Sequence, residues 1–512
     1  MLGRIMATAT ARPGHDRRHD ATSGVVAGAV LPARRVLPLY LLLGFSAGLP
    51  FYMFNAVLML RLARHGVDIV TIGYFAWVAL LPTFKFAWSP LVDRFAIPGF
   101  SRIWGKRRGW ILLSQLGIFA TMVAMAFTSG DENLPLVALF AVALAFWTTT
   151  LEVAADAWRI ELAPTQEQQA PIVAANLWGY RSAMVAAGSG AVLVAARADW
   201  MWAYLVIALA AFLAFPALAA TRPEEGARGS RWSALAGGIA ASVAIVALSV
   251  AAIALVGWLA LRAAGAAGID ADSNLTAAVL VVCLLPFAAL ALALPRIRRM
   301  EADAPARRSA TIGPFVDIFW RFGFGTLAVL AFVSLYRVGD VLALTLSHPL
   351  WNARGYSLDQ IGIADGAVAL PASMAGVALG GWMAARWPLG RALAAGALVA
   401  ALGNWAYAWL WWREPAAMAL YASVAADQFG NGFAGTVFVI YLSLLVNPRF
   451  PAAQYAFLSG FAFLLPRLLA GASGAIQQAI GYDGFFLLSG ALSLAALVFL
   501  PVLARLRPRA AT

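Results

Sequence analysis

Long apolar segments, separated by short polar ones, fill most of the chain. Each is close to the roughly 20 residues that an α-helix needs to cross the hydrocarbon core of a bilayer. We expect helices because lipid offers no hydrogen-bond partner for an open backbone N–H or C=O group. The pattern predicts fourteen membrane spans, at about residues 36–60, 69–91, 109–127, 134–157, 171–195, 200–220, 233–261, 274–295, 325–347, 359–384, 390–411, 415–446, 452–478 and 484–504.

Two polar linkers divide these spans into groups of six, two and six. TRPEEGARGSR follows the sixth span at residues 221–231, and RIRRMEADAPARRSA follows the eighth at residues 296–310. The two spans between them are rich in Ala, Val and Leu, which favours helix packing or lipid contact over a direct role in transport. The predicted organisation is an N-terminal tail, a six-helix half, a linker with two additional helices, a second six-helix half and a C-terminal tail. Their predicted ranges are 1–35, 36–220, 221–310, 311–505 and 506–512.

The composition agrees with this pattern. Of the 512 residues, 62% are hydrophobic and 12% are charged, which indicates an all-α polytopic membrane protein. A formal charge of +13 would suggest a nucleic-acid partner in a soluble chain. Here most of the 37 Lys and Arg residues fall in alternate loops and in the tails, as expected for segments that stay in the cytoplasm. This bias predicts an even number of spans, both termini in the cytoplasm and no nucleic-acid partner.

Residue types that metal sites and enzymes need are scarce. Cys283 is the single cysteine and lies in an apolar run. The four histidines fall in the tail or in short loops, at His15, His19, His65 and His348. No nucleophile and base arrangement or phosphate-binding loop is recognisable. We therefore expect no cofactor, no metal site and no enzymatic activity.

Each predicted half carries a loop with Gly and Arg after its second span. In the first half it is SPLVDRFAIPGFSRIWGKRRG, residues 89–109, and in the second it is GGWMAARWPLGRA, residues 380–392. Two six-helix halves with short basic loops at these positions are typical of major facilitator transporters. We predict that fold, with two extra central helices.

Charged residues inside the spans carry the candidate chemistry, because each costs roughly 3 kcal/mol at the centre of a bilayer helix. The first half contains Lys85, Glu152, Asp156 and Arg181, and the second contains Arg337, Asp340, Asp365, Asp427 and Arg467. Glu152 and Asp156 share one helix face. The carboxylates of span four and the arginine of span five recur as Asp427 on span twelve and Arg467 on span thirteen. The sequence thus predicts that the two halves repeat a pairing of acid and arginine.

Two interpretations of these charges remain open. In the first, each arginine neutralises a nearby carboxylate, and the pairs hold helices in register or lock a gate. In the second, a buried carboxylate titrates, and alternating access carries its proton across the membrane with the substrate. Asp340 and Asp427 are the leading candidates for this proton coupling, followed by Asp156 and Glu152.

Several residues are candidates for substrate binding. An arginine suits a carboxylate or phosphate through paired hydrogen bonds. Uncharged polar side chains add hydrogen bonds in a cavity, and an aromatic ring stacks on a sugar, with core packing as the alternative. The candidates are Arg337, Arg467, Arg181, Asn55, Asn176, Gln428, Asn431, Trp178 and Tyr336.

The motifs FKFAWSPLVDR, GKRRGW, EVAADAWRIELAP, LWGYRSAM, LYRVGDVLAL and AAQYAFLSG resemble those of the AmpG-type muropeptide permeases, a branch of the major facilitator superfamily. The resemblance runs from about residue 38 to residue 500. It implies import of anhydromuropeptides from periplasm to cytoplasm, driven by the proton gradient. The residues of this chain that match the family's motifs include Lys85, Asp93, Arg94, Asp156, Arg181, Arg337, Asp340, Gln454 and Arg467. The implied gating loop consists of Lys85, Asp93, Arg94, Lys106, Arg107 and Arg108.

The chain departs from this family at two places on helices that are expected to face the cavity. Leu151 and Glu152 stand where the family usually has Gln and Asp. Asp427, Gln428, Phe429 and Gly430 stand where it has Glu-Asn and then Cys-Gly-Gly.

Three functional hypotheses follow. The first is a monomeric, proton-coupled importer of muropeptides in a bacterial inner membrane. The second is a relative with another anionic cargo, such as a siderophore or an acyl-CoA-like molecule, and the third is an assembly factor that transports nothing. Intramembrane charges in both halves favour a transporter.

Overall fold

The computed structural model describes residues 33–67, 71, 75–128, 133–221, 233, 236–240, 243–244, 262, 292–301, 304–309, 312–470, 472–506 and 509. Cys283, most of the predicted N-terminal tail and most of the two predicted central spans lie outside these residues. The boundaries of the tails and of the central linker therefore stay predictions.

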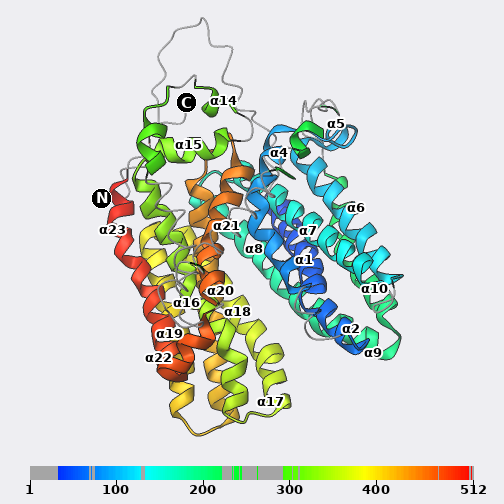
Figure 1. Ribbon diagram of the computed structural model, residues 1–512, viewed down its shortest axis with the longest axis vertical. Coiled ribbons are helices and arrows are strands. Elements are labelled where there is room, and N and C mark those ends of the chain that lie inside the picture. The colour runs from blue at the N-terminus through cyan, green and yellow to red at the C-terminus, as the bar shows by residue number, and fades with distance from the viewer. Residues whose placement is uncertain are drawn as a thin grey trace, which may run out of the picture.

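Two helical bundles lie side by side (Figure 1). The N-terminal bundle, blue to green in the figure, contains α1 (Ala33–Tyr52), η2 (Met53–Val57), α2 (Leu58–Arg64), η3 (Ala76–Ala87), α4 (Ser89–Arg94), α5 (Phe100–Trp104), α6 (Lys106–Ala126), α7 (Leu134–Leu162), α8 (Gln166–Val185), η4 (Ala186–Gly190), α9 (Ala191–Arg197), α10 (Trp200–Phe212) and α11 (Ala214–Ala219).

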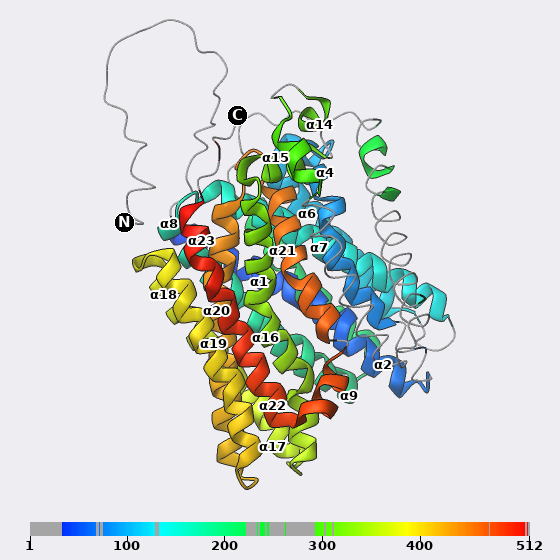
Figure 2. The same cartoon turned by 60° about the vertical axis from the view of Figure 1, so that its left-hand side comes forward.

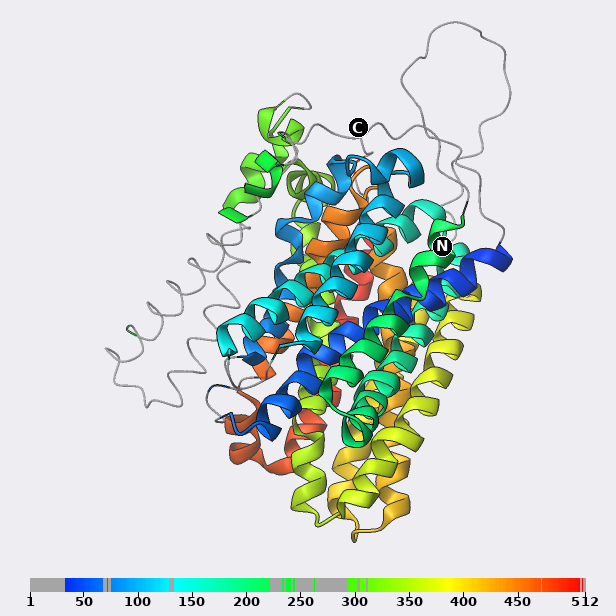
Figure 3. The same cartoon turned by 90° about the vertical axis from the view of Figure 1, so that its right-hand side faces the viewer.

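The C-terminal bundle, green to red, follows α14 (Pro305–Arg308). It contains α15 (Gly313–Phe322), α16 (Gly325–Ala353), α17 (Leu358–Ile363), η5 (Ala364–Val368), α18 (Ala369–Arg386), α19 (Leu389–Trp412), α20 (Ala417–Leu445), α21 (Pro451–Ala470), α22 (Ser473–Ala495), η6 (Ala496–Phe499) and α23 (Leu500–Arg505). Views from two other sides show the long helices of the C-terminal bundle running close to the long axis of the molecule, while those of the N-terminal bundle slant across it (Figures 2 and 3).

Nine helical segments in the described part of the chain are long and apolar enough to cross a membrane. They are Val36–Arg64, Lys106–Ala126, Leu134–Leu162, Trp200–Ala219, Gly325–Ala353, Asp359–Arg386, Leu389–Trp412, Ala417–Leu445 and Ser473–Arg505. The segment predicted at 171–195 is helical as α8, η4 and α9, and the one predicted at 452–478 begins as α21. The count of fourteen stays a prediction, because it includes the two central spans.

Two predicted spans differ from regular helices. Residues 76–87 form the 3-10 helix η3 with Pro82 inside it, and α4 begins separately at Ser89. Proline lacks an N–H and its ring clashes with the preceding turn, so the prediction of one helix over 69–91 is wrong there. The prediction of one helix over 452–478 is also wrong, since α21 ends at Ala470. Within α22, Gly481 has φ 76° and turns the chain, a conformation that glycine adopts without strain.

Small residues let neighbouring helices approach closely inside each bundle. A Cβ atom at Gly44 on α1 would lie 2.0 Å from the carbonyl oxygen of Asn176 on α8. A Cβ atom at Gly376 on α18 would lie 2.1 Å from the carbonyl oxygen of Phe429 on α20. Only glycine fits at such contacts between helix backbones.

A buried arginine caps the C-terminal end of α6. Arg61 on α2 is 4% exposed and donates to the carbonyl oxygen of Met125 at 2.8 Å and to that of Thr128. Its guanidinium also lies 5.0 Å from the ring centre of Tyr204 on α10. The last carbonyl groups of a helix have no partner within it, so a basic side chain stabilises this end.

The bundles are joined toward one end of the molecule. We call the end that carries α4, α5 and α15, at the top of Figure 1, the α4/α15 end, and the opposite end the α2/α17 end. Among the described residues, Asp93 makes hydrogen bonds to the other half at the α4/α15 end, and Arg467 makes one nearer the middle of the molecule. No described hydrogen bond or ion pair links α2 or α9 to α17. The structure is thus closed at the α4/α15 end.

Candidate functional site

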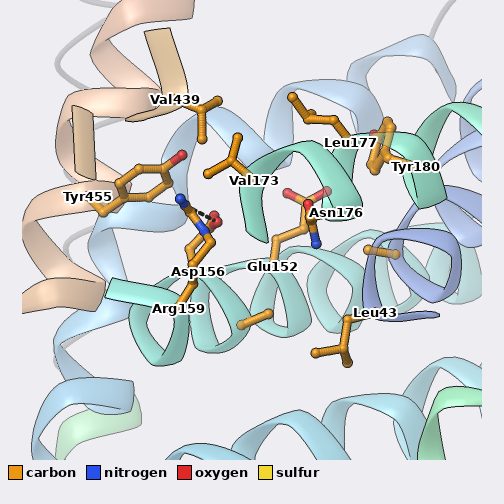
Figure 4. A pocket seen from close by; sticks show the side chains of 12 residues that line it. Leu43, Glu152, Asp156, Arg159, Val173, Asn176, Leu177, Tyr180, Val439 and Tyr455 are labelled. Atoms are coloured by element: carbon orange, nitrogen blue, oxygen red, sulfur yellow. Dashed lines mark hydrogen bonds and ion pairs between the residues drawn. The ribbon is translucent and has the colours of Figure 1, made fainter. Parts of the chain in front are cut away.

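A small cavity of about 170 Å³ lies where the two bundles meet (Figure 4). It is lined by Leu43 and Ala47 of α1, Glu152, Ala155, Asp156 and Arg159 of α7, Val173, Asn176, Leu177 and Tyr180 of α8, Val439 of α20 and Tyr455 of α21. Three predicted site residues, Glu152, Asp156 and Asn176, therefore come together here. The cavity combines carboxylate, amide, guanidinium and phenol groups from both halves.

Arg159 is the charged residue of the cavity that was not among the predicted site residues. Its side chain is 2% exposed, and its guanidinium lies 2.8 Å from the Asp156 carboxylate. It also donates to Gln169 at 2.9 Å and, across to the other half, to Ser443 at 3.0 Å. Figure 4 shows it between Asp156 and Tyr455. The signal was present in EVAADAWRIELAP, where this arginine follows Asp156 by three positions, one helical turn.

The predicted pairing of acid and arginine within each half is wrong. Arg181 forms no ion pair with the carboxylates of α7 among the described residues, and it donates instead to Asn431 of the C-terminal half at 2.9 Å. Arg467 donates to Thr83 of the N-terminal half and not to Asp427. Each arginine thus reaches across to the opposite bundle, because the packing of the bundles brings spans five and thirteen to their shared boundary.

Electrostatic interactions beyond hydrogen-bond distance also link charged side chains of the two bundles. Glu152 interacts with Lys85 of its own half and with Arg467 of the other half. Arg181 interacts with Asp427 and Arg337 of the C-terminal half. Charges from both bundles therefore face one another in the middle of the molecule.

The second carboxylate group lies inside the C-terminal bundle. Arg337 and Asp340 form an ion pair at 2.6 Å on α16, with side chains 10% and 3% exposed. This is the neutralising pair that the first interpretation of the charges expects. Asp427 on α20 accepts hydrogen bonds from Tyr407 at 3.2 Å and from Gln428 at 3.0 Å. It has no ion-pair partner among the described residues.

The other candidates for substrate binding differ in their placement. Trp178 is 37% exposed and donates to the carbonyl oxygen of Met374 across the boundary at 3.0 Å. Asn55 lies in η2 and is partly exposed. Tyr336 is 1% exposed, stacks on Phe438 with ring centres 5.3 Å apart and donates to a backbone oxygen of α19. Its position does not support sugar stacking, since both ring and hydroxyl are used in the core.

The predicted gating loop forms a compact network at the α4/α15 end. Arg107 lies 2.8 Å from Asp93 and 2.6 Å from Glu161, and Lys106 donates to the backbone oxygen of Asp93. The Asp93 carboxylate also accepts the backbone N–H groups of Ala452 and Ala453 at 3.1 and 2.8 Å, in the first turn of α21. A carboxylate is stabilised at a helix N-terminus by its free N–H groups and its dipole. This contact joins the two bundles.

Other members of the predicted loop lie outside that network. Arg108 donates to Thr221 at the end of the N-terminal half. Arg94 is exposed, with its guanidinium 5.3 Å from the ring centre of Phe95. Lys85 lies in η3, nearer the middle of the molecule, where it interacts with Glu152.

A second polar network supports the helix that Asp93 contacts. Asp317 on α15 pairs with Arg321 at 3.0 Å and accepts hydrogen bonds from Gln454 at 2.7 Å and Asn447 at 3.2 Å. Gln454 lies in the first turn of α21 and also accepts from Arg321. These bonds fix the start of α21 against α15. They thereby position the backbone N–H groups of Ala452 and Ala453, which donate to the Asp93 carboxylate.

Comparisons with known proteins find relatives by sequence and neighbours by fold. No family model matches the chain. The chain is 26% identical over 466 residues to the anhydromuropeptide permease of Escherichia coli strain K12, a match that covers 90% of this chain and 78% of that protein. It is 25% identical over 461 residues to putative transporter AmpG 4 of Rickettsia felis, covering 90% and 94%.

Solved structures give the fold. The proton:xylose symporter XylE, a major facilitator superfamily protein, aligns with a TM-score of 0.54 at 14% identity, covering 92% of this chain and 95% of that one. The names of these relatives are those of a permease and a transporter and not of enzymes. The chain is a multi-pass membrane protein with the major facilitator fold, and over nine-tenths of its length it resembles the AmpG-type permeases.

Proposed function

We propose that this protein imports peptidoglycan-derived anhydromuropeptides, GlcNAc-1,6-anhydroMurNAc peptides, from the periplasm to the cytoplasm for cell-wall recycling. It would act as a monomer in a bacterial inner membrane, with both termini in the cytoplasm, by proton symport. The likeness to anhydromuropeptide permease supports the cargo, and the basic loops support the orientation.

One observation carries the proposal of a transported anion. Arg181 and Arg467 reach from opposite halves to neutral partners, Asn431 and Thr83, at the boundary between the bundles. A muropeptide carries carboxylates on its peptide, and an arginine held by a neutral hydrogen bond can exchange that bond for a carboxylate. A substrate bound by both arginines would connect the two bundles, as alternating access requires.

The closed α4/α15 end supports entry of the substrate from the opposite side of the membrane. With both termini in the cytoplasm, the α4/α15 end is the cytoplasmic side, and the Asp93 contact with α21 closes it. The molecule then represents a state that accepts substrate from the periplasm. Release to the cytoplasm would break the Asp93 contact.

Proton symport is assigned to carboxylates inside the bundles. Asp340 and Asp427 are proposed to exchange protons, with Asp156 and Glu152 as the corresponding groups of the N-terminal half. Asp427 supports this assignment because it accepts hydrogen bonds from a phenol and an amide and forms no ion pair among the described residues. Asp340 would exchange its proton when Arg337 turns to substrate.

Uptake by right-side-out membrane vesicles tests the proposal. Vesicles that contain the protein should accumulate radiolabelled anhydromuropeptide when an inward proton gradient is imposed, and a protonophore should abolish the accumulation. Absence of uptake above that of empty vesicles would refute the cargo. Uptake that a protonophore leaves unchanged would refute symport. If unlabelled siderophore or acyl-CoA competes for uptake better than unlabelled muropeptide does, the preferred substrate would be that other anion.

A further inference from the structure

An exposed histidine and carboxylate pair lies at the α2/α17 end of the C-terminal half. His348 is in the last turns of α16 and Asp365 is in η5, with Nε2 and Oδ2 2.8 Å apart. Their side chains are 54% and 46% exposed, whereas every other described ion pair has at least one side chain that is 10% exposed or less. Both side chains of this pair are therefore accessible from outside the bundle.

Buried aromatic groups connect this pair to the interior. The ring of Trp351 lies 4.5 Å from the ring of His348 and 6.2 Å from the ring of Tyr407. Trp351 and Tyr407 are 2% and 1% exposed. Asp365 lies close enough to Tyr407 to interact with it electrostatically. The Tyr407 hydroxyl then donates to the Asp427 carboxylate at 3.2 Å.

The series continues to the middle of the bundle. Asp427 interacts electrostatically with Asp340, which is paired with Arg337. Trp351 Nε1 and the Tyr356 hydroxyl, in the same aromatic cluster, are buried without a hydrogen-bond partner among the described residues. Buried polar groups of this kind are ordinarily satisfied by water. The described groups thus form a series from His348 and Asp365 at this end, through Tyr407, to Asp427 and Asp340.

We infer that His348 and Asp365 form the proton-access pair of the C-terminal half, and that Tyr407 passes the proton to Asp427. The inference rests on the symport proposed above and adds the route by which the proton arrives. Neither residue has a role in substrate binding in this scheme. Intramembrane ionisable groups commonly mark such relays, and the wider turn of a π-helix such as η5 is frequent at functional sites.

The transfer conserves protons at every step. The imidazole of His348 takes a proton from water at the open end and gives it, through the hydrogen bond, to Asp365. Water carries it to the Tyr407 oxygen as the Tyr407 hydroxyl proton moves to Asp427. Tyr407 ends neutral, Asp427 ends protonated, and the histidine and Asp365 return to their first charges, with the histidine proton now on the other ring nitrogen.

Other charged groups near the pair are held elsewhere. Arg354 at the end of α16 donates to the backbone oxygen of Arg413, and Asp483 of α22 accepts from Trp412 at 3.2 Å. Asp359 of α17, Tyr421 of α20, Tyr482 of α22, Tyr356 before α17 and Glu414 between α19 and α20 are further titratable groups at this end. The described interactions of Asp365 are with His348 and Tyr407.

Purified protein in liposomes gives the transport test. Two assays are compared: accumulation of labelled anhydromuropeptide driven by a proton gradient, with a dye reporting internal pH, and exchange of labelled for unlabelled substrate without a gradient. H348Q, D365N and Y407F should lose accumulation and the dye signal while exchange persists, because exchange needs no net proton movement. H65Q, which changes an exposed histidine at the same end of the other half, should behave as wild type. Unchanged accumulation in H348Q/D365N, or parallel loss of exchange, would overturn the inference.

A second measurement does not depend on the cargo. The chain has four histidines, so ¹⁵N-histidine NMR of the detergent-solubilised protein can follow each imidazole, with H348Q assigning the signal of His348. D427N should move the titration midpoint of His348 and leave that of His65 unchanged. A His348 titration that is the same in wild type and D427N would overturn the relay even if muropeptide uptake is observed. A coupled titration with no muropeptide uptake would support the relay and refute the cargo.

Discussion

Replacing Asp93 by Asn should open the α4/α15 end. The carboxylate is 5% exposed and accepts two backbone N–H groups from the first turn of α21 while it pairs with Arg107. Asn keeps the shape of the side chain but removes its charge and turns an NH₂ group toward one of these donors. Arg107 keeps Glu161 as a partner, so the variant should still fold.

The magnitude follows from these contacts. A hydrogen bond to a charged group is worth about 1.5–3 kcal/mol, and a charge at a partly buried helix end up to about 2 kcal/mol. Because Asn retains one acceptor, we expect the closed state to lose about 2 kcal/mol relative to the open one. That loss changes the ratio of the two states by roughly thirtyfold.

Spin-label distances across the opposite end measure this shift. Labels at A63C on α2 and D359C on α17, in a chain whose native Cys283 is replaced by Ala, report how far the halves separate there. The D93N variant should add a population with a shorter distance, since opening one end closes the other. E167Q removes an exposed carboxylate from the first turn of α8 and serves as the control that leaves the distribution unchanged. A D93N distribution identical to that of wild type would refute the reasoning.

Three further predictions test the packing and the buried charges. Gly44→Ala should lower the melting temperature in detergent because α1 must separate from α8, whereas Gly188→Ala, with no atom within 4 Å of its new Cβ, should not; equal melting temperatures would contradict the close contact. Arg337→Ala or Asp340→Ala alone should lower the melting temperature more than the double variant does, because each single change leaves a buried charge unpaired; a double variant destabilised by the sum of the two would show that they act separately. Arg61→Ala should cost about 2 kcal/mol of stability in a thermal unfolding assay by exposing the end of α6, and an unchanged midpoint would show that this end needs no cap.

The helical segments were accessible to sequence analysis because each depends on its own composition. An apolar segment of bilayer length must be helical wherever it lies, and Arg337 and Asp340 are three positions apart on one such helix. The ion pair between them therefore needs no partner from the rest of the fold. Proline and glycine modified this picture locally, as in η3 and at Gly481, where backbone chemistry outweighed hydropathy.

The sequence by itself determined the membrane-spanning character, the helices and the residue types available for chemistry. Only the tertiary structure decided that Arg181 and Arg467 contact opposite halves, that Arg159 joins Asp156 to Ser443, and that Asp93 receives the N–H groups of α21. These contacts join residues that are more than 200 positions apart. Their existence depends on how two bundles meet, and no periodicity within one segment encodes that relation.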